Sequence, residues 1–243
     1  MGKPQNTVGT STFERIKKDI IFGDLAPGVK LKLDTLKGRY SASVSTLRET
    51  LNRLASEGFV DAEEQRGFFV TQVSREDLIE ITNLRILLEC HALAASVQNG
   101  DADWEGNLVA AHHKLHIMEK RMLAGDDSEK ETWKRYDWEF HQALIQACNS
   151  RNLLSLHATI YDKYLRYQIL VLTYRGEEAV AEHKSVFEAA LARDAEKAVN
   201  DLEEHIRKGV NMLWRLCDTS SLENFPAQYF YSAEQILITK LKN

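Results

Sequence analysis

The chain has 243 residues, of which 44% are hydrophobic and 28% charged, a composition typical of an ordered globular protein. Its apolar runs are too short to span a bilayer and its first residues are polar, which argues against a transmembrane helix and a signal peptide and favours a cytoplasmic location. The net charge of −5 is divided unevenly, because residues 1–72 contain 11 Lys/Arg and 9 Asp/Glu (net +2) whereas the remainder contains 20 and 27 (net −7).

The first third of the chain predicts three short helices and a hairpin. Residues 12–22 carry apolar side chains at helical spacing and end at Gly23, and a second short helix is expected at 34–40. Ser43 is a good N-cap for a third helix with one apolar face. At 59–70 the hydrophobic period changes from 3.6 to 2, which indicates a hairpin. This is the element order of a winged helix-turn-helix, whose third helix enters the major groove of DNA.

The same region carries a specific combination of short motifs: Gly23-Asp24-Leu25-Ala26-Pro27-Gly28, Leu31, Ser43-Val44-Ser45-Thr46-Leu47-Arg48-Glu49, Leu54, Glu57-Gly58 and Arg66-Gly67. Together they resemble the DNA-binding domain of GntR-family bacterial transcription regulators over about residues 12–73. The resemblance implies DNA contacts from the third helix and from the wing, by Ser43, Ser45, Thr46, Arg48, Arg66 and Gly67. The family often has Arg where this chain has Val44, so its usual operator sequence does not transfer. Alternatively, Arg48 and Arg53 are only solvated surface charges.

From Ser74 onward the pattern is helical, with breaks at turn-forming residues. Candidate helices lie near 75–97, 103–123, 128–148, 152–173, 177–192 and 194–216. Helices of this number and length make an antiparallel bundle that can enclose a cavity. We therefore expect a mainly α protein with a winged helix-turn-helix at 1–73, a six- to seven-helix bundle at 74–216 and a tail at 217–243. The tail contains a possible short helix at 233–242 and has no assigned role.

Four polar residues lie on the apolar stripes of these predicted helices: Asp137, His141, His183 and His205. A buried charge or imidazole without a partner costs several kcal/mol, so a shared partner is expected. His183 and His205 are equally distant from the predicted helix break at 194, which places them at the same height in an antiparallel hairpin. One Asp and three His from three helices suit a divalent cation such as Zn, Ni or Mn. Satisfied core histidines without a metal are the alternative.

This pattern resembles the helical, FCD-type ligand-binding domain of the FadR-like branch of the GntR family over residues 74–216. Metal-binding members of that branch use an Asp-x-x-x-His pair, a later His, and another His about 22 residues further on. Asp137, His141, His183 and His205 match these positions one by one. The resemblance implies a metal site in the bundle. A competing cluster, His112, His113 and His116, lies beside or away from its apolar stripe, so a solvated or helix-packing role is expected there.

Arg85 also lies on a buried stripe, where an always-charged guanidinium needs an anion. Glu89, one turn further on, is one candidate, and the carboxylate of a bound metabolite is the other. The resemblance to the family supports an Arg at this point of the first bundle helix. Tyr164 faces inward on a neighbouring predicted helix and either lines the same cavity or packs in the core. Arg85 and Tyr164 are therefore the predicted effector-binding residues.

These features predict a homodimeric DNA-binding regulator, not an enzyme, whose affinity for an inverted-repeat operator responds to a small carboxylate. A metal-dependent hydrolase is the alternative, because the same ligands can activate water. No His-Asp dipeptide of the helical phosphohydrolases occurs, however, and Glu182 points about 100° away from the adjacent His183 on a helix. A bundle that only dimerises would not need the four polar residues. The segment 36–40 and Val44 are similar to regulators of carbon-starvation genes that respond to C5 dicarboxylates, with sugar acids and other dicarboxylates as alternatives.

Overall fold

The structure is a computed structural model that describes residues 8–171 and 175–217 of the chain. Within these ranges no helix is both long and apolar enough to cross a membrane. Residues 218–243, which make up most of the predicted tail and include the possible short helix at 233–242, lie outside the described residues.

The described residues form two compact units. The first comprises the residues up to Leu78 together with Tyr161–Val171, and the second comprises Ile79–Ile160 and the described residues from 175 onward. The domain boundary expected at residue 73 stays a prediction.

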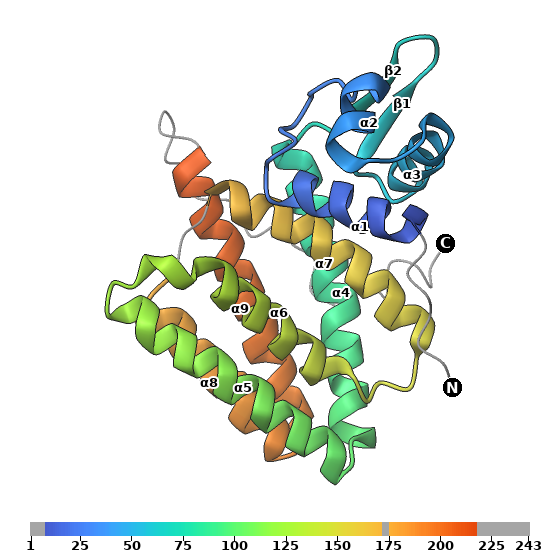
Figure 1. Ribbon diagram of the computed structural model, residues 1–243. Helices are drawn as coiled ribbons and strands as arrows, with labels where there is room; N and C mark the ends of the chain where they lie inside the picture. Colours follow the sequence, from blue (N-terminus) through green and yellow to red (C-terminus); the bar gives the residue numbers. More distant parts are fainter. Residues whose placement is uncertain (1–7, 172–174, 218–243) are drawn as a thin grey trace. The chain divides into compact units, whose positions relative to one another are not determined.

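The first unit contains three helices and a two-stranded antiparallel sheet: α1 (Val8–Ile21), α2 (Leu33–Tyr40), α3 (Val44–Ser56), β1 (Val60–Glu63) and β2 (Gly67–Val70) (Figure 1). Val60 pairs with Val70 and Glu63 pairs with Gly67, so the polar residues between the strands form the tip of a wing. The element order predicted from the change in hydrophobic period, that of a winged helix-turn-helix, is confirmed.

The apolar faces of these elements share one core. Leu47, Leu51 and Leu54 of α3 have no exposed surface, and neither does Ile16 of α1. Burying each such side chain stabilises the fold by about 1.5–3 kcal/mol relative to leaving it in water. The outer face of α3 is left to polar side chains. The other core residues come from all the elements of the unit and the segments between them: Phe13, Ile20, Ile21, Leu25, Leu31, Leu36, Tyr40, Ala42, Phe59, Val60 and Val70.

The last turns of α7 (Arg151–Val171) also belong to the first unit. The Lys17 ammonium group of α1 lies 2.8 Å from the Asp162 carboxylate. The Tyr167 hydroxyl donates a hydrogen bond of 2.5 Å to the Asp77 carboxylate. Within the first unit, the last turns of α7 therefore pair with α1 and with the first turn of α4.

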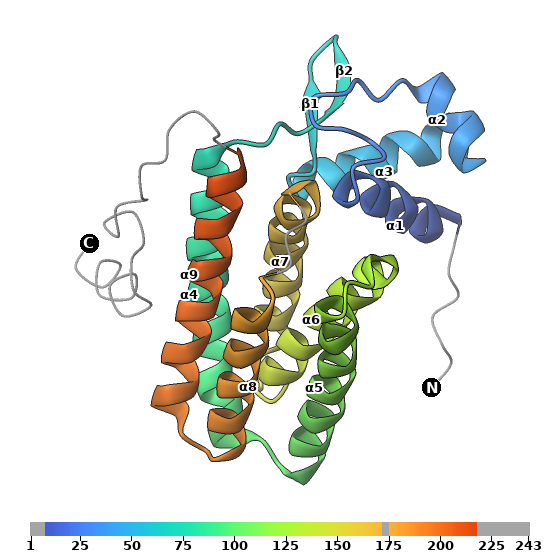
Figure 2. The same ribbon diagram turned by 90° about the vertical axis from the view of Figure 1, so that its left-hand side faces the viewer.

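The second unit is all-helical, and α5 packs against α6 while α8 packs against α9. Its described elements are α4 (Arg75–Asn99), α5 (Ala102–Leu123), a 3₁₀ turn η1 (Asp127–Glu129), α6 (Lys130–Ile145), the first turns of α7, α8 (Glu177–Leu191) and α9 (Ala195–Cys217) (Figure 2). The predicted helical bundle is confirmed. Both α4 and α7 contribute residues to both units.

Some helix ends differ from the prediction, and α1 begins at Val8 where we expected residue 12. We expected the third bundle helix to reach residue 148, but α6 ends at Ile145. The Cys148 amide donates to the Ile145 carbonyl at 3.2 Å, and Asn149 has a φ of +58°, a left-handed conformation that Asn tolerates. The turn that closes the helix is therefore tighter than its apolar pattern indicates.

Candidate functional site

The predicted DNA contacts of the third helix lie together at the start of α3. Ser43 is the N-cap, and its hydroxyl oxygen accepts a hydrogen bond of 3.1 Å from the Thr46 amide. The same oxygen lies 2.8 Å from the Ser45 hydroxyl, and Arg48 is exposed on the next turn. A helix N-terminus with exposed hydroxyl groups and a guanidinium suits phosphate and base-edge contacts.

The predicted wing residues are at the tip of the hairpin. The Arg66 side chain is 72% exposed and pairs with Glu63 at 2.5 Å. Gly67 has a φ of +101°, a left-handed backbone conformation that favours glycine, which lets the strands reverse. Arg53, by contrast, lies 4.2 Å above the centre of the Phe13 ring, so it packs on the first unit's core.

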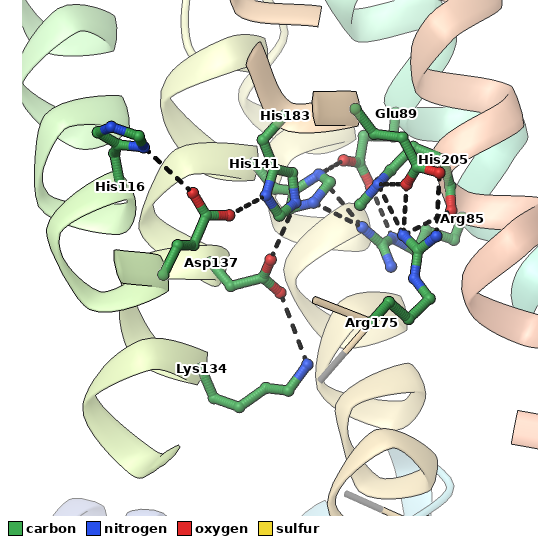
Figure 3. A network of polar contacts seen from close by, with 11 residues as sticks. Arg85, Glu89, His116, Lys134, Asp137, His141, Arg175, His183 and His205 are labelled. Atoms are coloured by element: carbon green, nitrogen blue, oxygen red, sulfur yellow. Dashed lines mark hydrogen bonds and ion pairs between the residues drawn. The ribbon is translucent and has the colours of Figure 1, made fainter. Parts of the chain in front are cut away.

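The structure brings three of the predicted metal ligands together in the second unit. His141 on α6, His183 on α8 and His205 on α9 are all buried, and one ring nitrogen of each lies within 4.8 Å of the others (Figure 3). The centres of the His183 and His205 rings are 4.5 Å apart, across the α8–α9 hairpin. Three helices thus converge on one point through histidines.

Asp137, the fourth predicted ligand, lies beside this cluster. Its Oδ1 is 3.3 Å from Nε2 of His183, and its Oδ2 is 3.9 Å from the buried Lys134 ammonium group. Burial would raise the pKa of Asp137, but Lys134 and the neighbouring histidines His141 and His183 hold that pKa well below its usual range. Asp137 is therefore an ionised carboxylate at the edge of the histidine cluster.

Each histidine of the cluster has a carboxylate at Nδ1. Nδ1 of His183 lies 2.6 Å from Glu119, and Nδ1 of His205 lies 2.8 Å from Glu182. Nδ1 of His141 contacts Glu89. A carboxylate at Nδ1 favours the tautomer that carries its proton there and leaves the Nε2 lone pair available, which is the arrangement of metal-bound histidines.

Two further observations support a divalent cation at the histidine cluster. Nε2 of His183 is buried and faces Oδ1 of Asp137 at 3.3 Å. Burial would lower the pKa of His183, but its hydrogen bonds to Asp137 and Glu119 raise that pKa to about 9. For His205 burial is the dominant effect, and it lowers the pKa well below its usual range. The carboxylates therefore draw a positive charge into a cluster of three imidazoles and one carboxylate, a donor set that suits Zn, Ni or Mn.

Arg85 contacts Glu89, one of the two partners considered for it. Its Nε donates to Glu89 at 2.8 Å, the partner expected one turn further on. Its terminal nitrogen Nη2 also lies 3.2 Å and 3.3 Å from the two ring nitrogens of His141. Glu89 accepts a third contact of 3.0 Å from His157 of α7. Tyr164 belongs to the first unit, where it is buried beside Tyr161, and its effector role stays a prediction.

A second arginine, Arg175, lies just before α8 and makes a similar arrangement with residues of α8 and α9. It forms two contacts with Glu182, of 3.1 Å and 2.6 Å, and its Nη2 lies 3.0 Å from Nδ1 of His205. Sequence reasoning missed Glu119 and His157, although both lie on apolar helix faces and carried the same signal as the predicted ligands. It considered Glu182 only as a base. Arg175 lies at a helix break, where no periodicity marks it.

The competing histidine cluster has the packing role expected for it. The His112 ring stacks on Phe187 at 4.0 Å between ring centres, and His113 is exposed. His116 lies 3.8 Å from Glu119. None of the three belongs to the group of metal-ligand type found among the described residues.

Comparisons with known proteins agree with this division of the chain. Residues 9–70 match the family described as "Bacterial regulatory proteins, gntR family", and residues 80–208 match the FCD domain. The chain is 36% identical, over 84% of its own length and 84% of the relative's, to the "Uncharacterized HTH-type transcriptional regulator BphR" of Paraburkholderia xenovorans LB400. It is 31% identical to the "HTH-type transcriptional repressor GlaR" of Escherichia coli K12, over 79% of this chain and 89% of that protein.

Solved structures share the fold. The E. coli McbR/YncC structure superposes with a TM-score of 0.73 at 20% identity, covering 87% of this chain and 99% of that one. A putative GntR regulator from Rhodococcus sp. RHA1 gives a TM-score of 0.69 at 20% identity, covering 85% and 97%. The family matches and the curated relatives are transcriptional regulators and not enzymes, which excludes the hydrolase alternative. The chain belongs to the GntR family of bacterial transcription regulators and carries an FCD ligand-binding domain.

Proposed function

We propose that this regulator binds an inverted-repeat operator as a homodimer in the cytoplasm, and that a small carboxylate bound at a divalent metal in the FCD domain modulates its affinity for DNA. The observation that carries the proposal is the buried cluster of His141, His183 and His205, whose Nδ1 atoms are each held by a glutamate. Asp137, at the edge of the cluster beside His183, adds a carboxylate to the three imidazoles.

The DNA-binding half of the proposal is supported by the first unit. Regulators of this family bind DNA operators and typically dimerise. One winged helix covers only a half-site, so two copies related by a two-fold axis read an inverted repeat. Ser43, Ser45, Thr46 and Arg48 would contact DNA from α3, and Arg66 and Gly67 from the wing.

The sensing half is supported by the charges around the histidine cluster. Among the described residues of this network, three cations (Arg85, Lys134, Arg175) accompany four carboxylates (Glu89, Glu119, Asp137, Glu182). This set has a net charge of −1 with neutral histidines, and a divalent cation changes it to +1. Because an enclosed positive charge is costly, the loaded site favours an anionic ligand.

A divalent metal held by Asp137, His141, His183 and His205 would supply an open coordination position for a carboxylate oxygen. Arg85 and Lys134 would then neutralise the remainder of the anion from α4 and α6. A ligand that contacts several helices at once can favour one packing of the bundle over another. The chemistry fits a short dicarboxylate. Segment 36–40 is similar to regulators that respond to C5 dicarboxylates, and sugar acids and other dicarboxylates are the alternatives.

The test uses full-length protein and an operator selected from a random DNA pool. Fluorescence anisotropy would measure operator affinity with Zn²⁺ alone and with glutarate, succinate or a sugar acid. We expect the effector to change affinity roughly 5- to 150-fold, which corresponds to about 1–3 kcal/mol of coupling. Arg85→Ala should abolish this response and still bind DNA.

Arg135→Ala is the matched control, because Arg135 is an exposed arginine on α6. It should respond to the effector as the wild type does. An Arg85→Ala protein with a normal effector response would contradict the anion-binding role of Arg85. A wild type that responds equally after removal of metal with a chelator would contradict the role of the metal.

A further inference from the structure

The tip of the wing carries a charge that opposes binding to DNA. Its charged residues are Glu63, Glu64 and Arg66, which give residues 63–66 a net charge of −1. The Arg66 guanidinium group also pairs with the Glu63 carboxylate at 2.5 Å, so its charge is partly neutralised. Because the DNA backbone is a polyanion, a wing that contacts it has to draw on a cation from another part of the unit.

The segment before α2 runs beside β2 and extends the wing. Two main-chain hydrogen bonds, of 2.8 Å and 2.9 Å, join residues 29–31 to residues 68–70. They flank an antiparallel bridge between Lys30 and Phe69. Lys30 and Phe69 are thus a non-hydrogen-bonded pair, which is the kind of cross-strand pair whose side chains lie closer together.

The pairing directs the Lys30 side chain to the outer face of the wing. Successive residues of a strand point to opposite faces of a sheet. Leu31 is 3% exposed in the core of the first unit, whereas Lys30, the residue before it, is exposed. Val70 of β2 is fully buried, and Phe69 before it is half-buried. Lys30 and Phe69 therefore share the face that is turned to solvent.

The Lys30 side chain lies beside the two residues of the wing that are predicted to contact DNA. Its Nζ is 5.4 Å from the centre of the Phe69 ring, and the Arg66 guanidinium carbon is 5.6 Å from the centre of the same ring. Its Cε is 3.8 Å from the position that a Cβ would occupy at Gly67. An aromatic ring attracts a cation without neutralising its charge, so Lys30 brings a full positive charge to this part of the wing.

On this basis, and resting on the DNA-binding role of the first unit, we propose that Lys30 is a further DNA-contact residue, which binds a backbone phosphate beside the wing. A lysine ammonium group is a point charge with three N–H donors on a flexible stem, which suits a phosphate oxygen. Phosphate contacts position a protein on the duplex and do not read its sequence. Lys30 therefore adds affinity at each half-site and leaves the choice of operator to α3.

The salt dependence of DNA binding tests this contact. Fluorescence anisotropy measures the affinity of full-length wild type and Lys30→Gln for the selected operator between roughly 50 and 200 mM salt. Each phosphate contact contributes about 0.9 to the slope of log affinity against log salt concentration. The slope of Lys30→Gln should therefore be smaller by about 0.9 for each half-site, so that wild-type affinity falls roughly 3- to 4-fold more per half-site over this range.

Lys18→Gln is the matched control. Lys18 is also exposed, and its Nζ is likewise 5.4 Å from the centre of a phenylalanine ring, that of Phe22. It belongs to α1, which packs against the inner face of α3. Lys18→Gln should keep the wild-type slope, and so should Lys30→Arg, which retains the charge. A wild-type slope in Lys30→Gln, or an equal loss of slope in Lys18→Gln, would overturn the proposal.

Two further measurements separate a phosphate contact from a base contact. Lys30→Gln should lower the affinities for the operator and for an unrelated duplex by the same factor, whereas Arg48→Ala should mainly lower that for the operator. Ethylation of one phosphate per half-site should weaken binding by the wild type and leave Lys30→Gln unaffected.

A changed base preference in Lys30→Gln, or the same ethylation pattern in both proteins, would overturn the phosphate contact. A wild type that binds no operator contradicts the DNA-binding role of the first unit itself. Operator binding with an unchanged slope in Lys30→Gln contradicts only the role of Lys30.

Discussion

At the scale of single residues, the histidine cluster shows how a helical bundle accommodates buried charge. Glu89 has no exposed surface, yet Arg85, His141 and His157 surround it. Burial would raise the pKa of Glu89, but the Arg85 and His141 charges hold it well below its usual range. Removing one partner of such a group leaves a buried charge uncompensated, which typically costs about 3–5 kcal/mol.

Lys134 is a buried cation in the opposite situation, because its surroundings disfavour its charged form. Burial lowers the pKa of Lys134 to about 8, and the Arg85 and Arg175 charges act in the same direction, while Asp137 opposes them. Arg85 of α4 and Arg175 of the segment before α8 are thus close enough to act on Lys134 of α6. Such a concentration of positive charge is expected at a site that takes up an anion.

His112 provides a prediction about pH. Burial lowers the pKa of His112 to about 4 from its ordinary value of 6.5, against the opposing charges of Glu119 and Glu188. Folding therefore favours the neutral ring, so its contribution to stability is present above pH 6.5 and is lost as the pH falls toward 4. The free energy of unfolding of the wild type should decrease over this range more than that of His112→Phe.

Phe replaces the imidazole with a ring that still stacks on Phe187 and cannot take up a proton. Urea denaturation at pH 7 and pH 5 measures the difference. His113→Phe is the control, because His113 is exposed on the same helix. Equal losses of stability in the wild type and His112→Phe would contradict the assigned environment.

At the scale of elements, the sequence predicts the helices well because their buried residues repeat with the helical period. The inner face of α3 and the stripes of α6, α8 and α9 repeat with the helical period, and the buried residues are the ones that the stripes contain. The end of α6 could not be predicted, since a tight turn at Cys148 and a left-handed Asn149 replace a helical turn without changing the apolar pattern.

The residues of the candidate site were predicted from the same helical periodicity. A polar residue on an apolar stripe is visible in a sequence, and Asp137, His141, His183 and His205 were found in this way. Their glutamate partners come from other helices, so each pairing depends on which helices pack together. Periodicity does not contain that information. Arg175 lies outside any stripe, and only the folded chain shows that it reaches His205.

α3, the helix predicted to enter the major groove of DNA, provides a testable prediction. Arg48→Ala should weaken binding to the operator by about 1–3 kcal/mol, the usual value of a good arginine contact to a base pair. The fold should be unaffected, because Arg48 is exposed on the polar face of α3. Fluorescence anisotropy with the selected operator, together with thermal unfolding, measures both properties.

Arg53→Ala is the informative companion variant. Arg53 is on the same helix but lies over the Phe13 ring, so its loss should lower thermal stability more than operator affinity. Unchanged operator affinity in Arg48→Ala would remove Arg48 from the DNA interface.

At the scale of the whole molecule, α4 and α7 are the elements that both units share. Glu89 of α4 and His157 of α7 are hydrogen-bonded to each other at 3.0 Å in the second unit. Further along α7, Asp162 pairs with Lys17 of α1 in the first unit. A ligand that changes the contacts of Glu89 would therefore act on α4 and α7, which both contribute residues to the DNA-binding unit, as the proposed coupling requires.

Metal content tests most directly whether the FCD domain of this protein holds a metal through its histidine cluster. Full-length wild type, His183→Ala and His205→Ala are reconstituted with Zn²⁺, dialysed and analysed for bound metal, with His113→Ala as the control for an exposed histidine. We predict about one Zn²⁺ per chain for the wild type and His113→Ala, and far less for the two cluster variants. A wild type without bound metal after reconstitution, or a His183→Ala protein that retains as much as the wild type, would contradict the claim.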